Sequence, residues 1–230
     1  MEKITNVSHA VDQIKDGMSV MVGGFLGCGS AQHVLEELSK RDVKNLTVMC
    51  NDGGLIGGPN GDDYYGLAKL IHNKQVSKLY VTHVGLNAEI GDQMAEGTIE
   101  VVLIPQGSFI EMIRAGGAGL GGVLTPTGVG TIIQDSEYVH SVVEIDGKKY
   151  LLKKPLKADV AIIAGTKIDE AGNMTYKGST RNFNEFMAMA ADVVIAEAEE
   201  IVPVGAIAPE DVVTPGILVD YIVKGGPVRG

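Results

Sequence analysis

Glycines cluster in the segment MVGGFLGCGS, residues 21–30, directly after a run of apolar residues. Gly23, Gly24, Gly27 and Gly29 leave a backbone that another group can approach closely. A helix is expected next, and the N–H groups at a helix N-terminus favour an anionic ligand. The spacing fits neither the dinucleotide motif GxGxxG nor the phosphate-binding motif GxxxxGK[ST]. The segment therefore predicts either a ligand contact or a tight structural turn, and spacing alone does not decide between them.

Cys28 lies among these glycines and is a candidate nucleophile, because a thiol near a helix N-terminus is acidified. The one histidine close to it in sequence is His33, a turn into the expected helix. A small side chain that fills a tight loop is the interpretation that the residues favour. Among the histidines we single out His83, which ends an expected strand. No HxH or HExxH pattern occurs, so the sequence predicts no metal site.

Gln106 is the second candidate for chemistry. It follows the apolar run VVLIP, at the point where a strand is expected to end and a helix to begin. Its side-chain amide could donate a hydrogen bond into a cleft at that edge. The tripeptide Pro105-Gln106-Gly107 could equally do no more than shape the turn, and the residues by themselves favour this second interpretation.

The elements around these residues alternate between strand and helix four times. Because the strands are continuous apolar runs, both of their faces should be covered, which predicts an α/β fold with an open, mostly parallel sheet and helices on both faces. Ser8 and Ser30 are expected to be helix N-caps. The strands are expected at 18–22, 45–50, 77–84 and 99–105, a long loop at 51–63, and the helices at 31–40, 64–74, 87–97 and 106–117.

The alternation of strands and helices ends after residue 137. Residues 138–155 alternate apolar and polar side chains around Asp146-Gly147, which predicts an inserted β-hairpin. Residues 158–169 and 190–202 are further buried strands, with a helix at 182–191 between them. No linker and no fixed repeat interrupts the chain, so we expect a single domain over residues 1–230.

Composition restricts the function. The chain has 19 Lys and Arg against 29 Asp and Glu, a formal net charge of −10, and no basic block. This argues against nucleic acid and anionic membrane as partners. Two cysteines are too few for a disulfide framework and suit a reducing cytoplasm. The N-terminus lacks the apolar segment of a signal peptide, and no run of about 18 apolar residues predicts a membrane span.

Taken together, these motifs resemble the family I CoA-transferases, and within them the α (A) subunits of the acetate/butyrate–acetoacetate CoA-transferases. The segment DGMSVMVGGFLGCGS resembles the family signature, although that signature normally closes with Gly-x-Pro and this chain has Gly29-Ser30-Ala31. The loop at 56–66 also looks longer than usual. The resemblance runs in order through ND at 51–52, HVGLN at 83–87, VVLIPQGSFIEMIRAGGAGLGG at 101–122, LTPTGVGT at 124–131, AGN at 171–173, RNFN at 181–184 and APEDVVTPG at 208–216.

The resemblance implies ping-pong chemistry on an acyl-CoA substrate, with no permanently bound cofactor. A glutamate carboxylate attacks the thioester and forms an enzyme glutamyl-CoA thioester, from which an acceptor carboxylate such as acetate, acetoacetate or butyrate takes the CoA. In the family that glutamate lies in the β half, in a Ser-Glu-Asn-Gly setting, and no glutamate of this chain precedes Asn-Gly. A homologous β subunit should therefore supply it.

The resemblance also assigns residues. Gln106 matches the family's oxyanion-hole glutamine, which reverses the preference for a mere turn. Gly23, Gly24, Phe25, Gly27 and Gly29 match the signature and are expected to contact CoA or the facing catalytic loop. Cys28 occupies a variable position and is expected to be inert.

Two alternatives use the same fold. A non-catalytic sensor of acyl-CoA or sugar phosphate would have no β partner. A phosphosugar isomerase should carry a phosphate-binding Lys or Arg in the glycine segment, and residues 22–30 contain neither.

Overall fold

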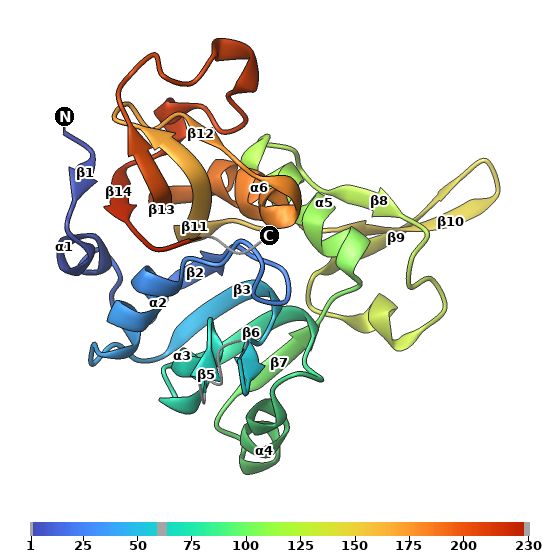
Figure 1. Cartoon of the computed structure of the whole chain (residues 1–230). Helices are drawn as coiled ribbons and strands as arrows, with labels where there is room; N and C mark the ends of the chain where they lie inside the picture. Colours follow the sequence, from blue (N-terminus) through green and yellow to red (C-terminus); the bar gives the residue numbers. More distant parts are fainter. Residues whose placement is uncertain (1, 59–63, 228–230) are drawn as a thin grey trace.

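The computed structural model describes residues 2–58 and 64–227 (Figure 1). Its centre is a sheet in the order β1-β14-β13-β11-β2-β3-β6-β7, with β12 paired to β11. Every strand pair along this path is parallel, and only the β11–β12 pair is antiparallel. The strands are β1 Ile4–Thr5, β2 Ser19–Val22, β3 Leu46–Asp52, β6 Val76–His83, β7 Glu100–Leu103, β11 Ala158–Asp169, β12 Met174–Thr175, β13 Ala191–Val202 and β14 Tyr221–Lys224.

Helices cover both faces of this sheet. Side chains alternate across a strand, so Val20 of β2 packs on one face and Met21 on the other. The first face packs against α1 Val7–Val11, α2 Gln32–Ser39, α3 Ala68–His72 and α4 Ala88–Glu96. The second packs against α5 Gln106–Gly117 and α6 Asn184–Met189. The predicted fold class is thereby confirmed.

The predicted hairpin is present and belongs to a small three-stranded sheet. Strands β9 Val139–Ile145 and β10 Lys148–Lys153 join at Asp146 and Gly147. The φ angles of these two residues are 50° and 74°. Positive values at both positions are those of a type I′ turn. Strand β8 Val123–Thr125 pairs with the other edge of β10.

That the whole chain is one domain stays a prediction from the sequence. Short 3₁₀ helices complete the described part of the chain. They span Ile132–Asp135, Gly178–Arg181, Pro209–Asp211 and Gly216–Leu218.

The segment expected as one long loop contains part of a second small sheet. Strand β4 Leu55–Ile56 pairs antiparallel with β5 Tyr64–Tyr65. The helix expected from residue 64 was therefore placed too early, and α3 begins at Ala68. Residues 59–63 of the long 56–66 loop lie outside the described residues.

Both predicted N-caps were wrong. The cap of α1 is Asn6, whose side chain accepts the His9 N–H, and Ser8 lies inside the helix. Helix α2 begins after Ala31 without a side-chain cap. The Ser30 hydroxyl instead donates to the Gly23 carbonyl at 3.5 Å, because the glycine loop turns back over it.

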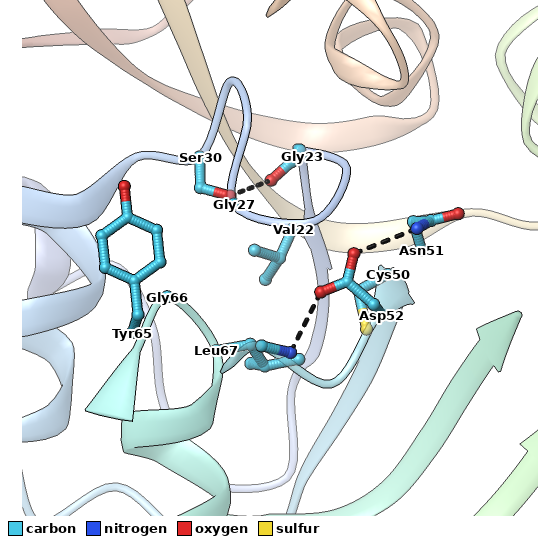
Figure 2. Close-up of a pocket in the computed structure, with 12 residues that line it drawn as sticks. Val22, Gly23, Gly27, Ser30, Cys50, Asn51, Asp52, Tyr65, Gly66 and Leu67 are labelled. Atoms are coloured by element: carbon cyan, nitrogen blue, oxygen red, sulfur yellow. Dashed lines mark hydrogen bonds between the residues drawn. The ribbon is translucent and has the colours of Figure 1, made fainter. Parts of the chain in front are cut away.

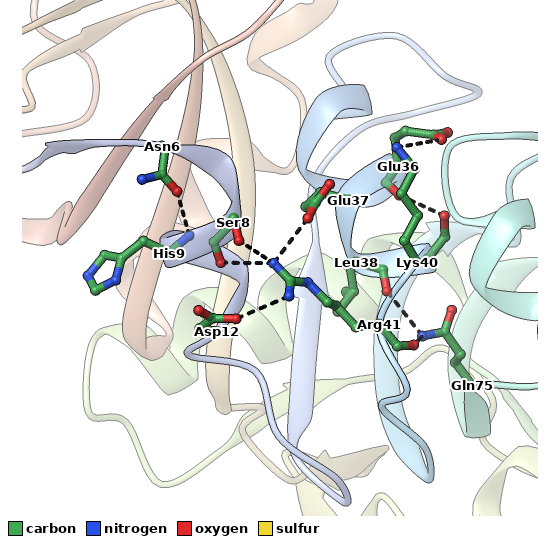
Figure 3. A network of polar contacts seen from close by, with 11 residues as sticks. Asn6, Ser8, His9, Asp12, Glu36, Glu37, Leu38, Lys40, Arg41 and Gln75 are labelled. Atoms are coloured by element: carbon green, nitrogen blue, oxygen red, sulfur yellow. Dashed lines mark hydrogen bonds and ion pairs between the residues drawn. The ribbon is translucent and has the colours of Figure 1, made fainter.

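Arg41 connects helices α1 and α2 (Figure 3). Its guanidinium contacts the Ser8 hydroxyl on α1 and the carboxylates of Asp12 and Glu37, the last at 3.0 Å. Gln75 donates to the carbonyls of Leu38 and Arg41. These contacts fix α1 and α2 relative to β6. Among the described residues, no helix is long and apolar enough to span a membrane.

Candidate functional site

The candidate site lies at the carboxyl ends of the central strands, where parallel α/β sheets bind ligands. An open cavity of about 360 Å³ lies between the loops that follow β2, β3, β6 and β7. Of the residues predicted for the site, Phe25 and Gln106 line it, together with His83, which the sequence singled out. The full lining is Phe25, Leu26, Asn51, Thr82, His83, Leu86 and Gln106.

A second, much smaller cavity of about 20 Å³ lies beneath the glycine loop (Figure 2). Gly23, Gly24 and Gly27 line it, facing Asn51 and Asp52 at the end of β3. A volume of this size holds about one water molecule. Because Asn51 lines both cavities, the end of β3 lies between the small cavity and the cavity of Gln106.

The glycine loop is a tight two-residue turn. The backbone N–H and C=O groups of Phe25 and Cys28 exchange two hydrogen bonds of 2.9 Å. Leu26 and Gly27 have φ angles of 50° and 80°. Two successive positive φ angles are typical of a type I′ turn, and a leucine in this region is strained. The Leu26 N–H is held by Asp52 Oδ2 at 2.8 Å.

This turn gives the cavity an apolar rim. The side chains of Phe25 and Leu26 are exposed by 39% and 44%. Both line the open cavity rather than the protein core. The strained turn therefore holds two apolar side chains where a ligand or a partner would meet them.

The glycines of this loop are required by contacts inside the chain. A Cβ on Gly23 would overlap the side-chain oxygen of Asn184, and one on Gly24 would overlap the Ser30 hydroxyl. A Cβ on Gly27 would lie 2.7 Å from the Tyr65 ring, and one on Gly29 would lie 2.6 Å from the Thr180 carbonyl oxygen. These contacts support the structural interpretation of the turn, while contact of Gly23, Gly24, Phe25, Gly27 and Gly29 with CoA stays a prediction.

The asparagines of the RNFN segment hold the loop from the opposite side. Asn184 Nδ2 donates to the carbonyls of Gly29 and Thr180 at 3.0 and 2.8 Å, and its Oδ1 accepts the Ala164 N–H. Asn182 Nδ2 donates to the Cys28 carbonyl at 3.0 Å. The sequence pointed to this segment through the family resemblance alone and gave it no role. A pair of asparagines at the start of a helix was the available signal.

Gln106 is the first residue of α5 and is exposed. Its Nε2 donates to Asn51 Oδ1 at 2.8 Å. Asn51 is only 2% exposed, and its Nδ2 donates to Asp52 Oδ2 at 3.0 Å. The Thr82 hydroxyl contacts the backbone and side-chain oxygens of Asn51 at 2.8 and 3.0 Å. The sequence pointed to Asn51 and Asp52 through the family resemblance alone and gave them no role, although two polar residues at the end of a buried parallel strand were a usable signal.

The Asp52 carboxylate is satisfied by N–H donors. It accepts from Leu26 N, from Gly54 N at 3.1 Å and from Asn51 Nδ2. Burial raises the pKa of the neighbouring Cys50 thiol well above its ordinary value, and the negative charge of Asp52 adds to this rise. Cys50 is therefore a protonated core thiol. Cys28 is half-buried, with its sulfur 3.3 Å from the Ser179 hydroxyl.

The chemistry that the cavity can supply is hydrogen-bond donation beside apolar surface. The Gln106 amide reaches an open cavity, and Phe25, Leu26 and Leu86 give it apolar walls. No glutamate or aspartate is among the residues that line it. In the described part of the chain, no group of three or more His, Cys, Asp or Glu residues could hold a metal ion. The cavity therefore offers a hydrogen-bond donor to a ligand, and no carboxylate lines it.

The chain is similar to known proteins along nearly all of its length. Residues 4–225 match the family described as Coenzyme A transferase. The chain is 46% identical, over 96% of its length and 97% of the relative's, to the acetoacetyl-CoA:acetate/butyrate CoA transferase alpha subunit of Clostridium acetobutylicum. It is 42% identical, over 96% of both chains, to the acetate CoA-transferase subunit alpha of Escherichia coli K12.

The fold also has solved counterparts. The acyl-CoA transferase of E. coli O157:H7, solved as a thioester complex with CoA, superimposes with a TM-score of 0.85 at 22% identity. The match covers 97% of the present chain but only 47% of that transferase, so the present chain spans about half of its length. At this identity the likeness establishes the fold and nothing further.

Proposed function

The chain belongs to the coenzyme A transferase family, and we propose that it is the α subunit of a heteromeric enzyme that moves CoA from a short-chain acyl-CoA to a carboxylate acceptor. The acceptors that we propose are acetate, acetoacetate and butyrate, the acyl groups of the bacterial relatives. These relatives are named as transferase subunits, so a non-catalytic sensor is not favoured. The enzyme is proposed to work in the cytoplasm.

One observation carries the proposal: the Gln106 amide lies at an open cavity that contains a hydrogen-bond donor but no carboxylate. CoA transfer between carboxylates through an enzyme thioester needs both a carboxylate nucleophile and donors for the tetrahedral oxyanions. This chain offers the second requirement. Because the relatives are named as alpha subunits, we propose that a partner subunit supplies the first.

In the proposed mechanism, a glutamate of the β subunit attacks the thioester carbon of the acyl-CoA. The tetrahedral oxyanion accepts a hydrogen bond from Gln106 Nε2 and collapses to a mixed anhydride with release of the CoA thiolate. The thiolate then attacks the glutamyl carbonyl, which frees the first carboxylate and leaves glutamyl-CoA thioester. The acceptor carboxylate repeats these steps in reverse, so the glutamate is regenerated. Each tetrahedral intermediate needs a donor placed in advance.

The apolar walls of the cavity fit this reaction. Phe25, Leu26 and Leu86 are exposed by 39%, 44% and 39%. We propose that the β subunit and the acyl-CoA cover these side chains in the assembled enzyme and thereby exclude water. Exclusion matters because a mixed anhydride and a thioester would both hydrolyse in open solvent. The glycine loop at residues 23–29 is proposed to border the bound acyl-CoA.

The test is to purify the chain from its own cells under native conditions and to sequence what co-purifies. We expect a near-equimolar homologous partner that carries Ser-Glu-Asn-Gly. The purified complex should transfer CoA from acetoacetyl-CoA to acetate, and mass spectrometry after incubation with acetoacetyl-CoA alone should find the CoA adduct on the partner's glutamate. Recovery of the chain only with itself, or an adduct on this chain, would refute the assignment.

A further inference from the structure

We propose that Asp52 and Asn51 form a relay that sets the direction of the Gln106 side-chain amide, so that its NH₂ group and not its carbonyl serves as the donor. Asp52 and Asn51 are positioning residues in this proposal, because they act through Gln106. The inference rests on the proposed function of Gln106 as an oxyanion donor. The relay explains why the Gln106 amide cannot rotate by 180° and exchange its NH₂ and C=O groups.

The relay begins at Asp52, which can only accept hydrogen bonds when ionised. Its Oδ2 accepts the Leu26 N–H at 2.8 Å and its Oδ1 accepts the Gly54 N–H at 3.1 Å. A backbone N–H group can only donate a hydrogen bond, so both carboxylate oxygens are held as acceptors. Asp52 is 8% exposed, so solvent contributes little to this arrangement.

Asn51 takes its direction from Asp52. An amide has a donor end and an acceptor end. Reversal would bring the Asn51 Oδ1 against a carboxylate oxygen, where its Nδ2 now lies at 3.0 Å. The Nδ2 therefore faces Asp52, and the Oδ1 faces Gln106 and the Thr82 hydroxyl. Asn51 is also 2% exposed. Water therefore cannot replace the partner that reversal would lose, and an unpaired buried polar group is costly.

Gln106 is the last member and the only exposed one. Asn51 Oδ1 is an acceptor that lies 2.8 Å from Gln106 Nε2. The Gln106 amide must therefore place its NH₂ group, and not its C=O group, at this contact. An amide NH₂ has two donors. One N–H is used at Asn51, and the second remains for a ligand in the cavity that both residues line. A reversed amide would present its carbonyl dipole to the oxyanion and would oppose the reaction.

The same carboxylate also holds the opposite wall of the cavity. Asp52 Oδ2 binds the strained Leu26 N–H as well as Asn51 Nδ2. One buried side chain thus anchors both the apolar turn at Leu26 and the polar group at Gln106. A change at Asp52 should disturb both, whereas a change at Asn51 should disturb only Gln106.

The test is a double-mutant cycle on the reconstituted αβ enzyme, with kcat and KM for CoA transfer measured separately. Asn51→Leu keeps the side-chain size and removes the side-chain hydrogen bonds to Asp52, Thr82 and Gln106. We expect it to lower kcat about tenfold, since misplacing a catalytic group by a fraction of an ångström has effects of this order. In the Gln106→Ala background the same change should alter kcat by less than about twofold, because the group it orients is absent.

A matched control separates orientation from general damage. Asn173 forms a similar pair, with its Nδ2 donating to Asp169 Oδ2 at 2.8 Å, but it lines neither cavity described above. Whatever factor Asn173→Leu produces should be the same with Gln106 and with Ala at that position. If Asn51→Leu does not assemble, Asp52→Asn changes a single atom. Its effect on kcat should be larger with Gln106 than with Ala at position 106, and the part that acts through Leu26 should remain in both backgrounds.

The outcomes distinguish failure of the proposed role of Gln106 from failure of the relay alone. If Gln106→Ala alone leaves kcat unchanged, the proposed role of Gln106 fails, and the relay fails with it. If Gln106→Ala loses activity but Asn51→Leu and Asp52→Asn cost the same factor in both backgrounds, the relay is overturned while the proposed function stands.

Discussion

The side-chain oxygen of Asn184 occupies the space in which any residue other than glycine at position 23 would place its Cβ. Asn184 is fully buried and cannot move aside without losing bonds to Gly29, Thr180 and Ala164. Gly23 follows the strand that enters the site, and Asn184 begins α6 on one face of the sheet. This contact connects two segments that are distant in sequence and fixes the position of the glycine loop relative to α6.

Gly23→Ala is therefore expected to destabilise the chain by ~1–3 kcal/mol, the usual cost of adding a methyl group to a filled site. Urea unfolding measures this directly. Gly91→Ala is the matched control, because Gly91 lies in α4 and nothing is within 4 Å of its missing Cβ. That change should stabilise the chain by up to ~1 kcal/mol, since alanine favours a helix. Equal stability of the two variants would contradict the role of Asn184.

Gln106→Ala is expected to lower kcat of the assembled enzyme by about 10²–10³-fold while KM changes little, as removal of an oxyanion donor does. Assembly should persist because the Gln106 side chain is exposed and is the last member of the hydrogen-bond chain through Asn51. Gln13→Ala, which removes an amide just beyond α1, should leave kcat as it is. A Gln106→Ala enzyme with the turnover of the unaltered enzyme would remove Gln106 from the mechanism.

The two cysteines are expected to behave differently and neither to be catalytic. Cys28→Ala should keep activity within about twofold, because Cys28 contributes its backbone to the turn and its thiol contacts Ser179. Cys50 should resist iodoacetamide in the folded chain, since burial raises the pKa of its thiol. The thiolate is the reactive form. Peptide mass spectrometry after labelling checks this. Loss of activity in a fully assembled Cys28→Ala enzyme would be the contrary result.

Glu197 should make stability depend on pH. Burial of this β13 side chain raises the pKa of its carboxyl above the ordinary 4.5, although the Val34 N–H and His33 act in the opposite direction. A carboxyl with a raised pKa in the folded state contributes stability below the unfolded pKa, and that stability is lost as pH rises through the folded pKa. Glu197→Gln should therefore raise Tm at about pH 8, and the gain should shrink towards about pH 4.

Exposed Glu144 on the hairpin provides the comparison for that series. Glu144→Gln should leave the pH dependence of Tm as in the unaltered chain, because no buried charge is removed. A Tm gain for Glu197→Gln that is the same at both ends of the pH range would show that packing, and not ionisation, is responsible.

The sequence by itself determined the layered architecture and several local details. Continuous apolar runs required strands covered on both faces, and alternation with helical segments required parallel pairing. Asp146-Gly147 determined a type I′ hairpin, and Gln106 was placed correctly at the start of α5. These features depend on residues close together in the chain, so local patterns were sufficient to predict them. The motifs along the chain were also sufficient for the family, which the comparisons confirmed.

Only the tertiary structure decided which polar groups meet. Gln106 and Asn51 are 55 residues apart, and Gly23 is held by Asn184 from a distant part of the chain. The expected cap at Ser30 failed because the loop brings its hydroxyl to the Gly23 carbonyl. The expected cap at Ser8 failed for a local reason, since Asn6 caps α1. A side-chain amide or hydroxyl can satisfy many partners at similar free energy, so its residue type does not select one. The packing of the sheet selects it, by bringing one partner within hydrogen-bond distance and excluding water from the others.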